Sequence, residues 1–184
     1  MVKRAQYVVL DTETTGLDKP AEVCSISIIS AGNEVLLNQL VRPTHSIPPS
    51  AVRVHGITDE RVKNEPSWVD VAPVVKKIIM NKDVIIYNAD YDRKIMHWSD
   101  EANHMPPQDW KEWSRFYCAM KWYAQVWGER YPRYGSYVWQ KLTKAIEQQG
   151  LMQLNAHNAL ADCLMTNALV QHCVERELDK SAPF

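Results

Sequence analysis

Two carboxylates, Asp11 and Glu13, stand two positions apart at the end of a short apolar run, residues 7–10. If this run is a β-strand, its alternation places both side chains on the same face of a sheet. Acids gathered in this way could serve a chemical site. A polar strand end that caps and turns the chain produces the same pattern, so the pair by itself leaves both interpretations open.

A second acidic segment follows another apolar run, residues 83–87. Asp90 and Asp92 stand where a buried strand would meet solvent, and the strand ends of α/β folds commonly carry functional sites. Either acid could instead stabilise the positive end of the helix that begins near Tyr91. We interpret Asp90 as a capping residue and Asp92 as a functional one.

The third segment, HNALAD at residues 157–162, opens a helix with an apolar stripe. At about 100° per residue, His157 and Asp162 would lie roughly 140° apart around a helix, so they cannot share a face if both are helical. We therefore expect His157 on the loop or first turn, where it can approach a site from another direction. A single histidine at a helix start is more often a surface residue than a catalytic one.

Four carboxylates in one cleft, from Asp11, Glu13, Asp92 and Asp162, would repel one another and raise each other's pKa unless cations neutralised them. Oxygen-only ligands select hard cations, Mg²⁺ or Mn²⁺, over zinc. Two Mg²⁺ ions about 3.5–4 Å apart can stabilise both the attacking and the leaving oxygen in phosphodiester hydrolysis. The acids are therefore suited to a two-metal hydrolytic site.

Together the three segments resemble the motifs of the DEDDh-type 3′→5′ exonuclease family. They are VLDTETTGL at 9–17, NADYD at 88–92 and HNALAD at 157–162, in the family's order and spacing. The family includes the proofreading subunit of bacterial DNA polymerase III, exonuclease X and ribonuclease T. The resemblance extends over residues 7–175, and the combination is far more specific than any one motif.

The resemblance implies a role for each residue of the acidic set. Asp11, Glu13, Asp92 and Asp162 would bind two Mg²⁺ ions, for which Mn²⁺ could substitute. His157 would be the general base that takes a proton from the attacking water, because a near-neutral imidazole suits that task at physiological pH. The product would be a nucleoside 5′-monophosphate.

The resemblance also implies a set of residues that contact the terminal nucleotide: Thr14, Thr15, Leu17, His55, Asn88 and Tyr91. Leu17 would pack against the terminal base. The main-chain amides of Thr14 and Thr15 would contact the ribose and its 3′-hydroxyl. His55, in the segment VHGIT, would help to seat the nucleotide, and Tyr91 stands where the family more commonly has phenylalanine.

The elements that must position these residues follow from the periodicity of the apolar side chains. Three β-rich runs at 7–10, 22–30 and 34–41, joined by tight turns, predict an antiparallel meander. After a proline-rich loop at 42–49, apolar spacings of three and four predict a helix over 68–79 and then a fourth strand at 83–87. Further helical patterns occur at 91–98, 114–126, 138–149 and 159–175.

Strands come first and helices later, which predicts an α/β fold. We expect a mixed β-sheet, with an antiparallel meander plus parallel strands, flanked by α-helices, and the family resemblance implies that it is ribonuclease-H-like. A length of 184 residues predicts a single exonuclease domain over 1–178, followed by a short C-terminal tail at 179–184.

The composition indicates the cellular setting. No run approaches the roughly 18 apolar residues of a membrane span, and residues 1–4 lead into a strand without a signal-peptide core, so we expect a cytoplasmic location and no membrane partner. The four cysteines are widely spaced and lack any C-x-x-C pair, which indicates buried thiols rather than zinc ligands or disulfides: Cys24, Cys118, Cys163 and Cys173.

The net charge is only −1 at pH 7, whereas many nucleic-acid-binding proteins are strongly basic. A site that holds divalent cations brings its own positive charge to a phosphodiester. We expect the partner to be the 3′ end of a nucleic acid. DNA is favoured over RNA because Thr12 and the Thr-Thr-Gly that follows resemble the DNA-directed branch of the family. Any protein partner and the oligomeric state are left open.

Several tryptophans of the middle segment could stack on unpaired bases: Trp110, Trp113, Trp122, Trp127 and Trp139. Core packing is the favoured interpretation, because Trp122 and its neighbour Tyr123 fall in an amphipathic pattern. Trp110 and Trp113, next to two prolines, are the two that we expect to be most exposed.

Three alternatives remain beside a DNA exonuclease. A phosphatase of the haloacid-dehalogenase type also has apolar residues, Asp and Thr at a strand end, but it needs a second Asp where this chain has Glu13. Such an enzyme would release inorganic phosphate, whereas an exonuclease releases mononucleotides. The other two are an exoribonuclease of the same family and a binding module that kept the fold and lost the site. The intact acids and His157 argue against the last.

Overall fold

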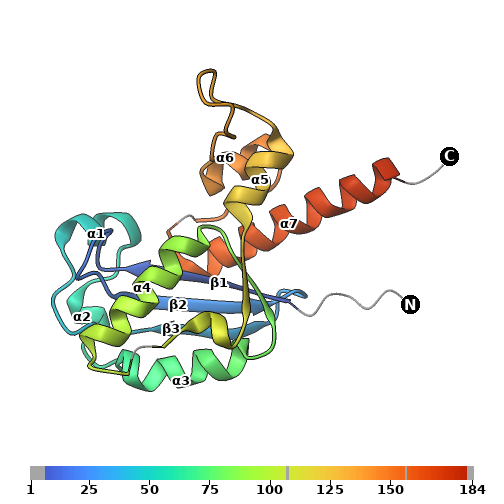
Figure 1. Ribbon diagram of the computed structural model, residues 1–184. Coiled ribbons are helices and arrows are strands. Elements are labelled where there is room, and N and C mark those ends of the chain that lie inside the picture. The colour runs from blue at the N-terminus through green and yellow to red at the C-terminus, as the bar shows by residue number, and fades with distance from the viewer. Residues whose placement is uncertain (1–6, 107, 156, 182–184) are drawn as a thin grey trace.

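The structure is a computed structural model that describes residues 7–106, 108–155 and 157–181, with side chains up to residue 176. Its centre is a mixed five-stranded sheet in the order β3-β2-β1-β4-β5 (Figure 1). Strands β1 (Tyr7–Thr14), β2 (Val23–Ser30) and β3 (Val35–Leu40) form an antiparallel meander. Strands β4 (Asp83–Ile86) and β5 (Arg115–Cys118) extend the sheet in parallel with β1. The predicted fold class is confirmed.

Seven α-helices and one 3₁₀ helix surround the sheet within the described ranges. They are α1 (Pro49–His55), α2 (Asp59–Val62), α3 (Trp68–Ile79), α4 (Ala89–Ala102), the 3₁₀ helix η1 (Trp110–Glu112), α5 (Ala119–Trp127), α6 (Leu142–Gln148) and α7 (Ala159–Ser181). The helix expected over 68–79 is confirmed. It starts with a capping box in which Ser67 and Asp70 bond reciprocally, and its apolar positions are buried against the sheet.

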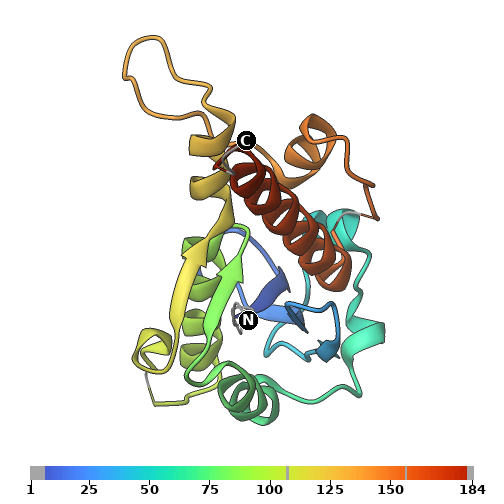
Figure 2. The ribbon, with the colours of Figure 1, turned by 90° about the vertical axis from the view of Figure 1, so that its right-hand side faces the viewer.

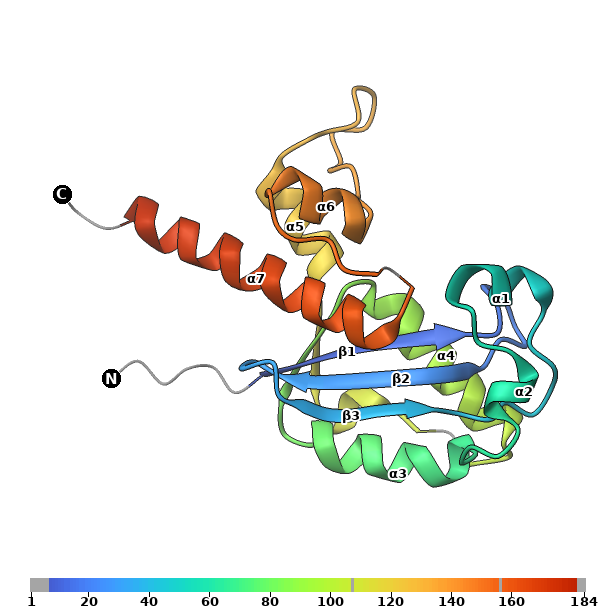
Figure 3. The same ribbon diagram turned by 180° about the vertical axis from the view of Figure 1, so that it is seen from behind.

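Strand β1 is buried on both faces, and its alternation decides what each face meets. Val8 and Leu10 pack into the main core cluster with residues of α3 and α4. Val9, between them, packs with Cys163 of α7 in a separate cluster. Helix α4 therefore lies on one face of the sheet and α7 on the other, as the front view in Figure 1 and the rear view in Figure 3 show. The polar residues at the end of β1 alternate in the same way between the α4 face and the α7 face.

The prediction of a helix over residues 114–126 was wrong in its first part. Residues 115–118 form β5, which pairs with β4 in parallel register from Asp83–Arg115 to Ile86–Cys118. Only from Ala119 does the chain become helical. A four-residue strand is too short to show its own periodicity, and its pairing partner lies more than 30 positions away, so local sequence could not reveal it.

The tryptophans also depart from expectation. Trp110 is buried, with its ring centroid 6.1 Å from that of Trp68 and 5.7 Å from that of Trp113, which is partly buried. The exposed tryptophans are Trp127 and Trp139 instead. The prediction that Trp110 would be exposed was wrong because a buried carboxylate, Asp100, provides an acceptor for its indole N–H.

The remaining sequence expectations concern thiols, membranes and the ends of the chain. Three cysteines, Cys24, Cys163 and Cys173, are buried, and Cys118 is partly buried. Among the helices in the described ranges, none combines the length and the apolar character needed to cross a bilayer. The expectation for residues 1–4 falls outside the described residues, as do residues 182–184 of the predicted tail.

Asp100 anchors the two indoles that close the core beside α4. Its Oδ1 accepts from Trp68 Nε1 at 2.8 Å and its Oδ2 from Trp110 Nε1 at 3.2 Å. Burial raises the pKa of Asp100 to about 6, even though both indole hydrogen bonds lower it. The carboxyl is therefore held in a place where its charge costs free energy.

This cost predicts a pH-dependent contribution to stability. Because the folded-state pKa lies above the ordinary 3.8, the stability from Asp100 is fully present below that value and is lost as pH rises through about 6. Relative to Asp100→Asn, the free energy of unfolding of the wild type should fall by up to about 3 kcal/mol between about pH 4 and pH 7. Urea unfolding of both proteins across this range measures the difference. A constant difference would show that burial does not shift this carboxyl.

Candidate active site

Three acidic side chains meet at the carboxyl end of β1. Asp11 and Glu13 come from the strand itself, and Asp162 comes from the first turn of α7. One ligand oxygen from each lies within 4.8 Å of the others. The alternation of β1 explains the meeting, because Asp11 and Glu13 continue the face of Val9, which packs against α7.

The partner strand leaves room for this cluster. In the β1–β2 register Asp11 lies opposite Ser27, and Glu13 lies opposite Ser25. Directly opposed residues of an antiparallel pair share a face with their side chains close together. Small serines at these two positions therefore leave the space beside the acids to α7 and Asp162.

The fourth predicted acid, Asp92, reaches the site from the other face of the sheet. It is buried in the first turn of α4, and its Oδ1 accepts from the backbone N of Thr12 at 3.1 Å and from Thr12 Oγ1 at 2.8 Å. Thr12 lies between Asp11 and Glu13 and points to the α4 side. Strand β1 thus presents its own two acids on one face and binds Asp92 of α4 on the other. The Thr12 contact fixes the position of Asp92 relative to the two acids of the strand.

These acids lie in a cavity of about 570 Å³, a size typical of small-ligand sites. The predicted site residues that line it are Asp11, Glu13, Thr14, Leu17, His55, Asn88, Tyr91, Asp92, His157 and Asp162. Thr15 is not among the lining residues. Its amide donates to Glu22 O at 2.8 Å and its Oγ1 accepts from Glu22 N at 2.9 Å, so it fixes the turn after β1. Its amide is not free for the expected contact with the ribose.

Burial raises the pKa of every carboxyl in the set. For Asp11 burial is the largest cause, and the charges of Asp92, Asp162 and Glu13 add to it. Burial, then Asp162 and Asp92, raise the pKa of Glu13 to about 8. Burial raises the pKa of Asp92 to about 7 against the hydrogen bonds from Thr12, and it raises the pKa of Asp162 as well. Ionising all four near neutral pH is therefore unfavourable without a cation.

Two oxygens of the cluster show that a cation fits here. Glu13 Oε1 and Asp162 Oδ1 are buried and have no hydrogen-bond partner within the described residues. Buried polar atoms are normally satisfied, so each of these two needs a partner that the protein does not provide. Carboxylate oxygens without nitrogen or sulfur donors are the ligand chemistry of hard divalent cations.

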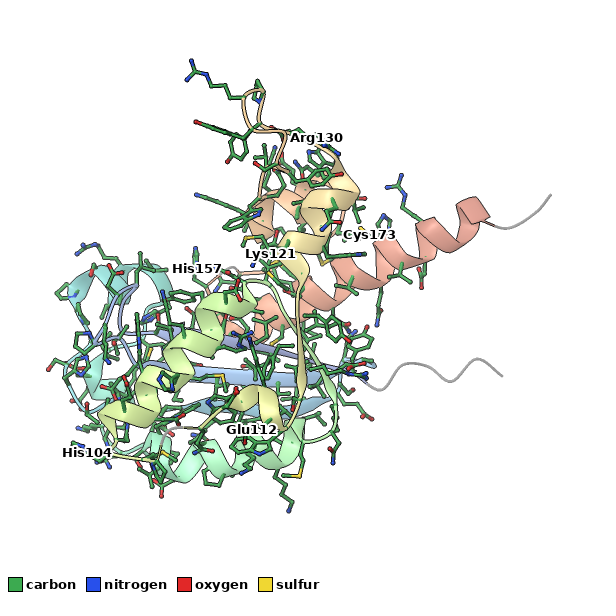
Figure 4. All side chains as sticks on the ribbon, in the orientation of Figure 1. His104, Glu112, Lys121, Arg130, His157 and Cys173 are labelled. Carbon is green, nitrogen blue, oxygen red and sulfur yellow. The ribbon has the colours of Figure 1, made fainter. Side chains whose placement is uncertain are left out.

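His157 lies on the loop before α7, as expected from the angular argument. It has a φ of 62°, in the left-handed region that residues other than glycine rarely adopt. Its backbone N donates to Asp162 Oδ2 at 3.3 Å, and its side chain is exposed at the cavity. Figure 4 shows it near the end of α4 that carries Asp92. The left-handed turn brings the imidazole and Asp162 to one cavity, although a continuous helix would separate them.

His55 is held as a neutral ring. Its Nδ1 accepts from Ile57 N at 3.0 Å, so this nitrogen is unprotonated, and Nε2–H donates to Thr14 O at 3.2 Å. Burial lowers the pKa of His55 in agreement with this assignment. The Nε2–H bond fixes the end of β1, and the Nδ1 bond fixes the ring against its own backbone at Ile57. Neither ring nitrogen is left to contact a ligand in the cavity.

Tyr91 braces the loop on the opposite side. Its hydroxyl donates to Gly16 O at 2.7 Å and lies 2.7 Å from Thr14 Oγ1, which itself donates to Gly16 O at 2.9 Å. A phenylalanine could not make these bonds. The tyrosine therefore fixes the loop that carries Leu17, which is 74% exposed at the cavity.

Sequence reasoning missed several residues that line the cavity. They are Thr12, Gly16, Ser50, Ala51, Val54, Tyr87 and Leu142. Val54 is 53% exposed, which a sequence does not show, but its place directly before His55 in the VHGIT segment was a signal that could have marked it. Leu142 and Tyr87 belong to apolar patterns and gave no such signal, because a cavity wall and a core have the same composition.

A mixed sheet that carries an acidic cluster suited to divalent cations could support metal-assisted hydrolysis, and comparison with known proteins specifies the class. The profile of the RNase T exonuclease family matches residues 8–170. The chain is 37% identical over 166 residues to the uncharacterized exonuclease CP81 of Escherichia phage 186, covering 89% of this chain and 85% of the phage protein. It is 30% identical over 164 residues to exodeoxyribonuclease 10 of Escherichia coli K12, covering 88% of this chain and 66% of that protein.

The chain therefore belongs to the RNase T family of DEDD exonucleases, and it is a 3′→5′ exonuclease of that family. The fold agrees. Exonuclease X, solved in complex with 5′-overhanging duplex DNA, superposes with a TM-score of 0.69 at 24% identity over 92% of each chain. The alternatives of a haloacid-dehalogenase phosphatase and of an inactive binding module are set aside by this membership and by the intact acidic cluster.

Replacing Asp162 with Asn tests the electrostatic account of the cluster. The change removes one of several repelling charges without loss of volume, so in a chelator the melting temperature should stay the same or rise. Mg²⁺ at 100 times its Kd should stabilise the folded wild type by about 2.7 kcal/mol and so raise its melting temperature. It should have little effect on the melting temperature of the variant. Glu147→Gln, which removes an exposed charge on α6, is the matched control. A normal Mg²⁺ response in Asp162→Asn would contradict the assignment of this ligand.

Proposed function

We propose that the protein removes nucleotides from the 3′ end of DNA, preferring single strands, and releases nucleoside 5′-monophosphates. One observation carries this proposal: the same cavity contains buried carboxylate oxygens without a hydrogen-bond partner in the described part of the chain, from Glu13 and Asp162, and an exposed apolar rim. The acids suit cations that bind a phosphodiester, and the rim residues Leu17 and Val54 suit the face of a base. A terminal nucleotide is the ligand that needs both.

DNA is favoured over RNA by the relatives. Exodeoxyribonuclease 10 is named for deoxyribonucleic acid, and exonuclease X was solved with a DNA duplex. Both similarities extend over about nine tenths of this chain. We therefore propose DNA as the substrate class of this protein as well.

Two Mg²⁺ ions, with Mn²⁺ as a substitute, are the proposed cofactors, held by Asp11, Glu13, Asp92 and Asp162. Bound divalent cations would neutralise the carboxylates and stabilise negative charge on the attacking and leaving oxygens. The protein's own part is to hold these acids in place. Thr12 fixes Asp92, and the His157 amide fixes Asp162.

His157 is the proposed general base. Water attacks the terminal phosphorus, and the imidazole takes the proton that the water loses. The bond from phosphorus to the 3′ oxygen of the preceding nucleotide breaks, and that oxygen takes a proton from solvent. The products are a nucleoside 5′-monophosphate and a strand one nucleotide shorter with a new 3′-hydroxyl.

The other cavity residues position the terminal nucleotide. Leu17 and Val54 hold the base, while Asn88, whose side chain does not cap α4, is free to contact substrate. Thr14 and Tyr91 keep the loop before Leu17 in place through their shared contact with Gly16 O. His55 acts as a positioning residue because both of its nitrogens bond to the protein.

His157→Ala should lower kcat by roughly 10²–10⁴-fold, the usual effect of losing a general base, with much less change in substrate binding. The matched control is His104→Ala. His104 is also exposed and left-handed, with a φ of 53°, but Figure 4 shows it at the far end of α4. Steady-state hydrolysis of a labelled oligonucleotide gives both parameters. A loss confined to affinity would make His157 a positioning group.

The substrate form is the next prediction. A paired terminal nucleotide must leave its stack to reach the cavity, and unpairing costs a few kcal/mol. Single-stranded DNA should therefore be degraded faster than a blunt duplex of the same sequence, from the 3′ end, and a 3′-phosphate should block the reaction. Gel analysis of 5′-labelled strands measures this. Equal rates on both forms, or cleavage of a circular single strand, would contradict it.

A further inference from the structure

Residues 128–141 form an arm that leaves the body of the protein between α5 and α6. Its two sides are joined by hydrogen bonds from Val138 N to Glu129 O and from Tyr131 N to Ser136 O, both 2.9 Å long, and by a bridge between Arg130 and Tyr137. Figures 1, 2 and 3 all show this arm projecting beyond the helices and away from the sheet. These bonds join its two sides, and near its base the buried Gln140 bonds to Tyr87 and Gln148 of the body.

The arm exposes several aromatic rings that are not needed to hold a surface segment in place. Tyr134 at the tip is 80% exposed, Trp139 near the base is 60% exposed, and Tyr131 is 48% exposed. Rings of this kind usually pack in a core, as Tyr123 of α5 does. Several together on one projecting segment provide flat apolar faces on which unpaired bases can stack.

Cations accompany the rings. The arm carries Arg130, Arg133 and Lys141 against one acid, Glu129, in a protein whose net charge is −1. The Arg130 guanidinium lies 4.4 Å from the ring centroid of Tyr137 and donates to its hydroxyl at 2.7 Å. Glu129 accepts a hydrogen bond from Gln140 at 3.0 Å. Rings and positive charges side by side match a polymer of bases and phosphates better than they match an apolar protein surface.

The base of the arm is continuous with the wall of the cavity. Gln140 O accepts from the hydroxyl of Tyr87 at 2.7 Å, and both Tyr87 and Leu142 line the cavity. Trp139 is the next residue of the arm, and Lys121 Nζ lies 5.8 Å from its ring centroid. Lys121 also pairs with Asp90 in the first turn of α4. Figure 4 labels His157, Lys121 and Arg130, which mark the cavity, the first turn of α5 and the arm.

We propose that this arm binds the unpaired strand that precedes the terminal nucleotide, with Trp139 and Tyr134 stacking on bases and the arginines contacting phosphates. This inference rests on the proposed function, because a strand whose end lies in the cavity must continue across a surface next to it. A cavity of about 570 Å³ holds only the end of such a polymer. The arm combines adjacency to the cavity, exposed rings and positive charge.

The test compares a thymidine oligonucleotide of about 15 nucleotides with a thymidine dinucleotide, which is too short to reach beyond the cavity. The double variant Trp139→Ala/Tyr134→Ala should raise KM for the long substrate by about 10-fold or more, since each lost stack weakens binding several-fold. The kcat on the long substrate and both parameters on the dinucleotide should not change. Binding of the fluorescent long oligonucleotide in a chelator, measured by anisotropy, should weaken by a similar factor.

Two controls separate stacking from structural effects. Trp139→Phe/Tyr134→Phe keeps the aromatic faces and should behave like the wild type. Tyr117→Ala removes an aromatic residue that is 49% exposed on β5, outside the arm, and should leave KM unchanged. Melting temperatures should be equal for all variants, because the substituted rings do not belong to the core.

Three outcomes would overturn the inference. Unchanged KM and unchanged binding of the long oligonucleotide in the alanine variant would show that the arm does not contact the strand. An equal loss on the dinucleotide would place the effect in the cavity. If the alanine variant differed from the wild type in its sedimentation coefficient, and its KM did not depend on substrate length, the arm would be a contact between copies of the chain. Failure of the wild type to shorten any DNA would refute the proposed function alone, and the anisotropy measurement would still decide whether the arm binds the strand.

Discussion

The burial of four neighbouring carboxylates is the constraint on which the rest of this structure depends. Asp11, Glu13, Asp92 and Asp162 are held close together in a setting where burial opposes their charge. An arrangement of that kind persists only if the surrounding structure fixes it. The strand β1 does most of this by presenting acids on one face and Thr12 on the other.

Further hydrogen bonds hold the elements that carry or adjoin the acids. His55 bonds to the last carbonyl of β1, and Tyr91 bonds to the loop after it. Ser99, in the same helix as Asp92, accepts from Val23 N at 2.9 Å and fixes α4 against β2. Rigidity around the site thus comes from side-chain bonds to backbone groups, which keep their geometry whether or not the acids are charged.

The sequence predicted the parts of this arrangement that depend on local periodicity. Alternation placed Asp11 and Glu13 on one face, and the helical angle placed His157 outside the helix of Asp162. It could not predict the Thr12–Asp92 contact or the indole bonds of Asp100, since these join residues far apart in the chain. The arm at 128–141 was equally hidden, because tryptophan in a core and tryptophan on a projecting segment look the same in a sequence.

Helix α7 is the last element of the described chain, and it carries Asp162 at its start and packs across β1 and β2. During synthesis the ribosome delivers β1 and α4 long before α7 has emerged. Until then one carboxylate is missing and the face of the sheet bearing Asp11 and Glu13 lies open to water. The acidic cluster to which we assign the reaction is therefore complete only when α7 docks.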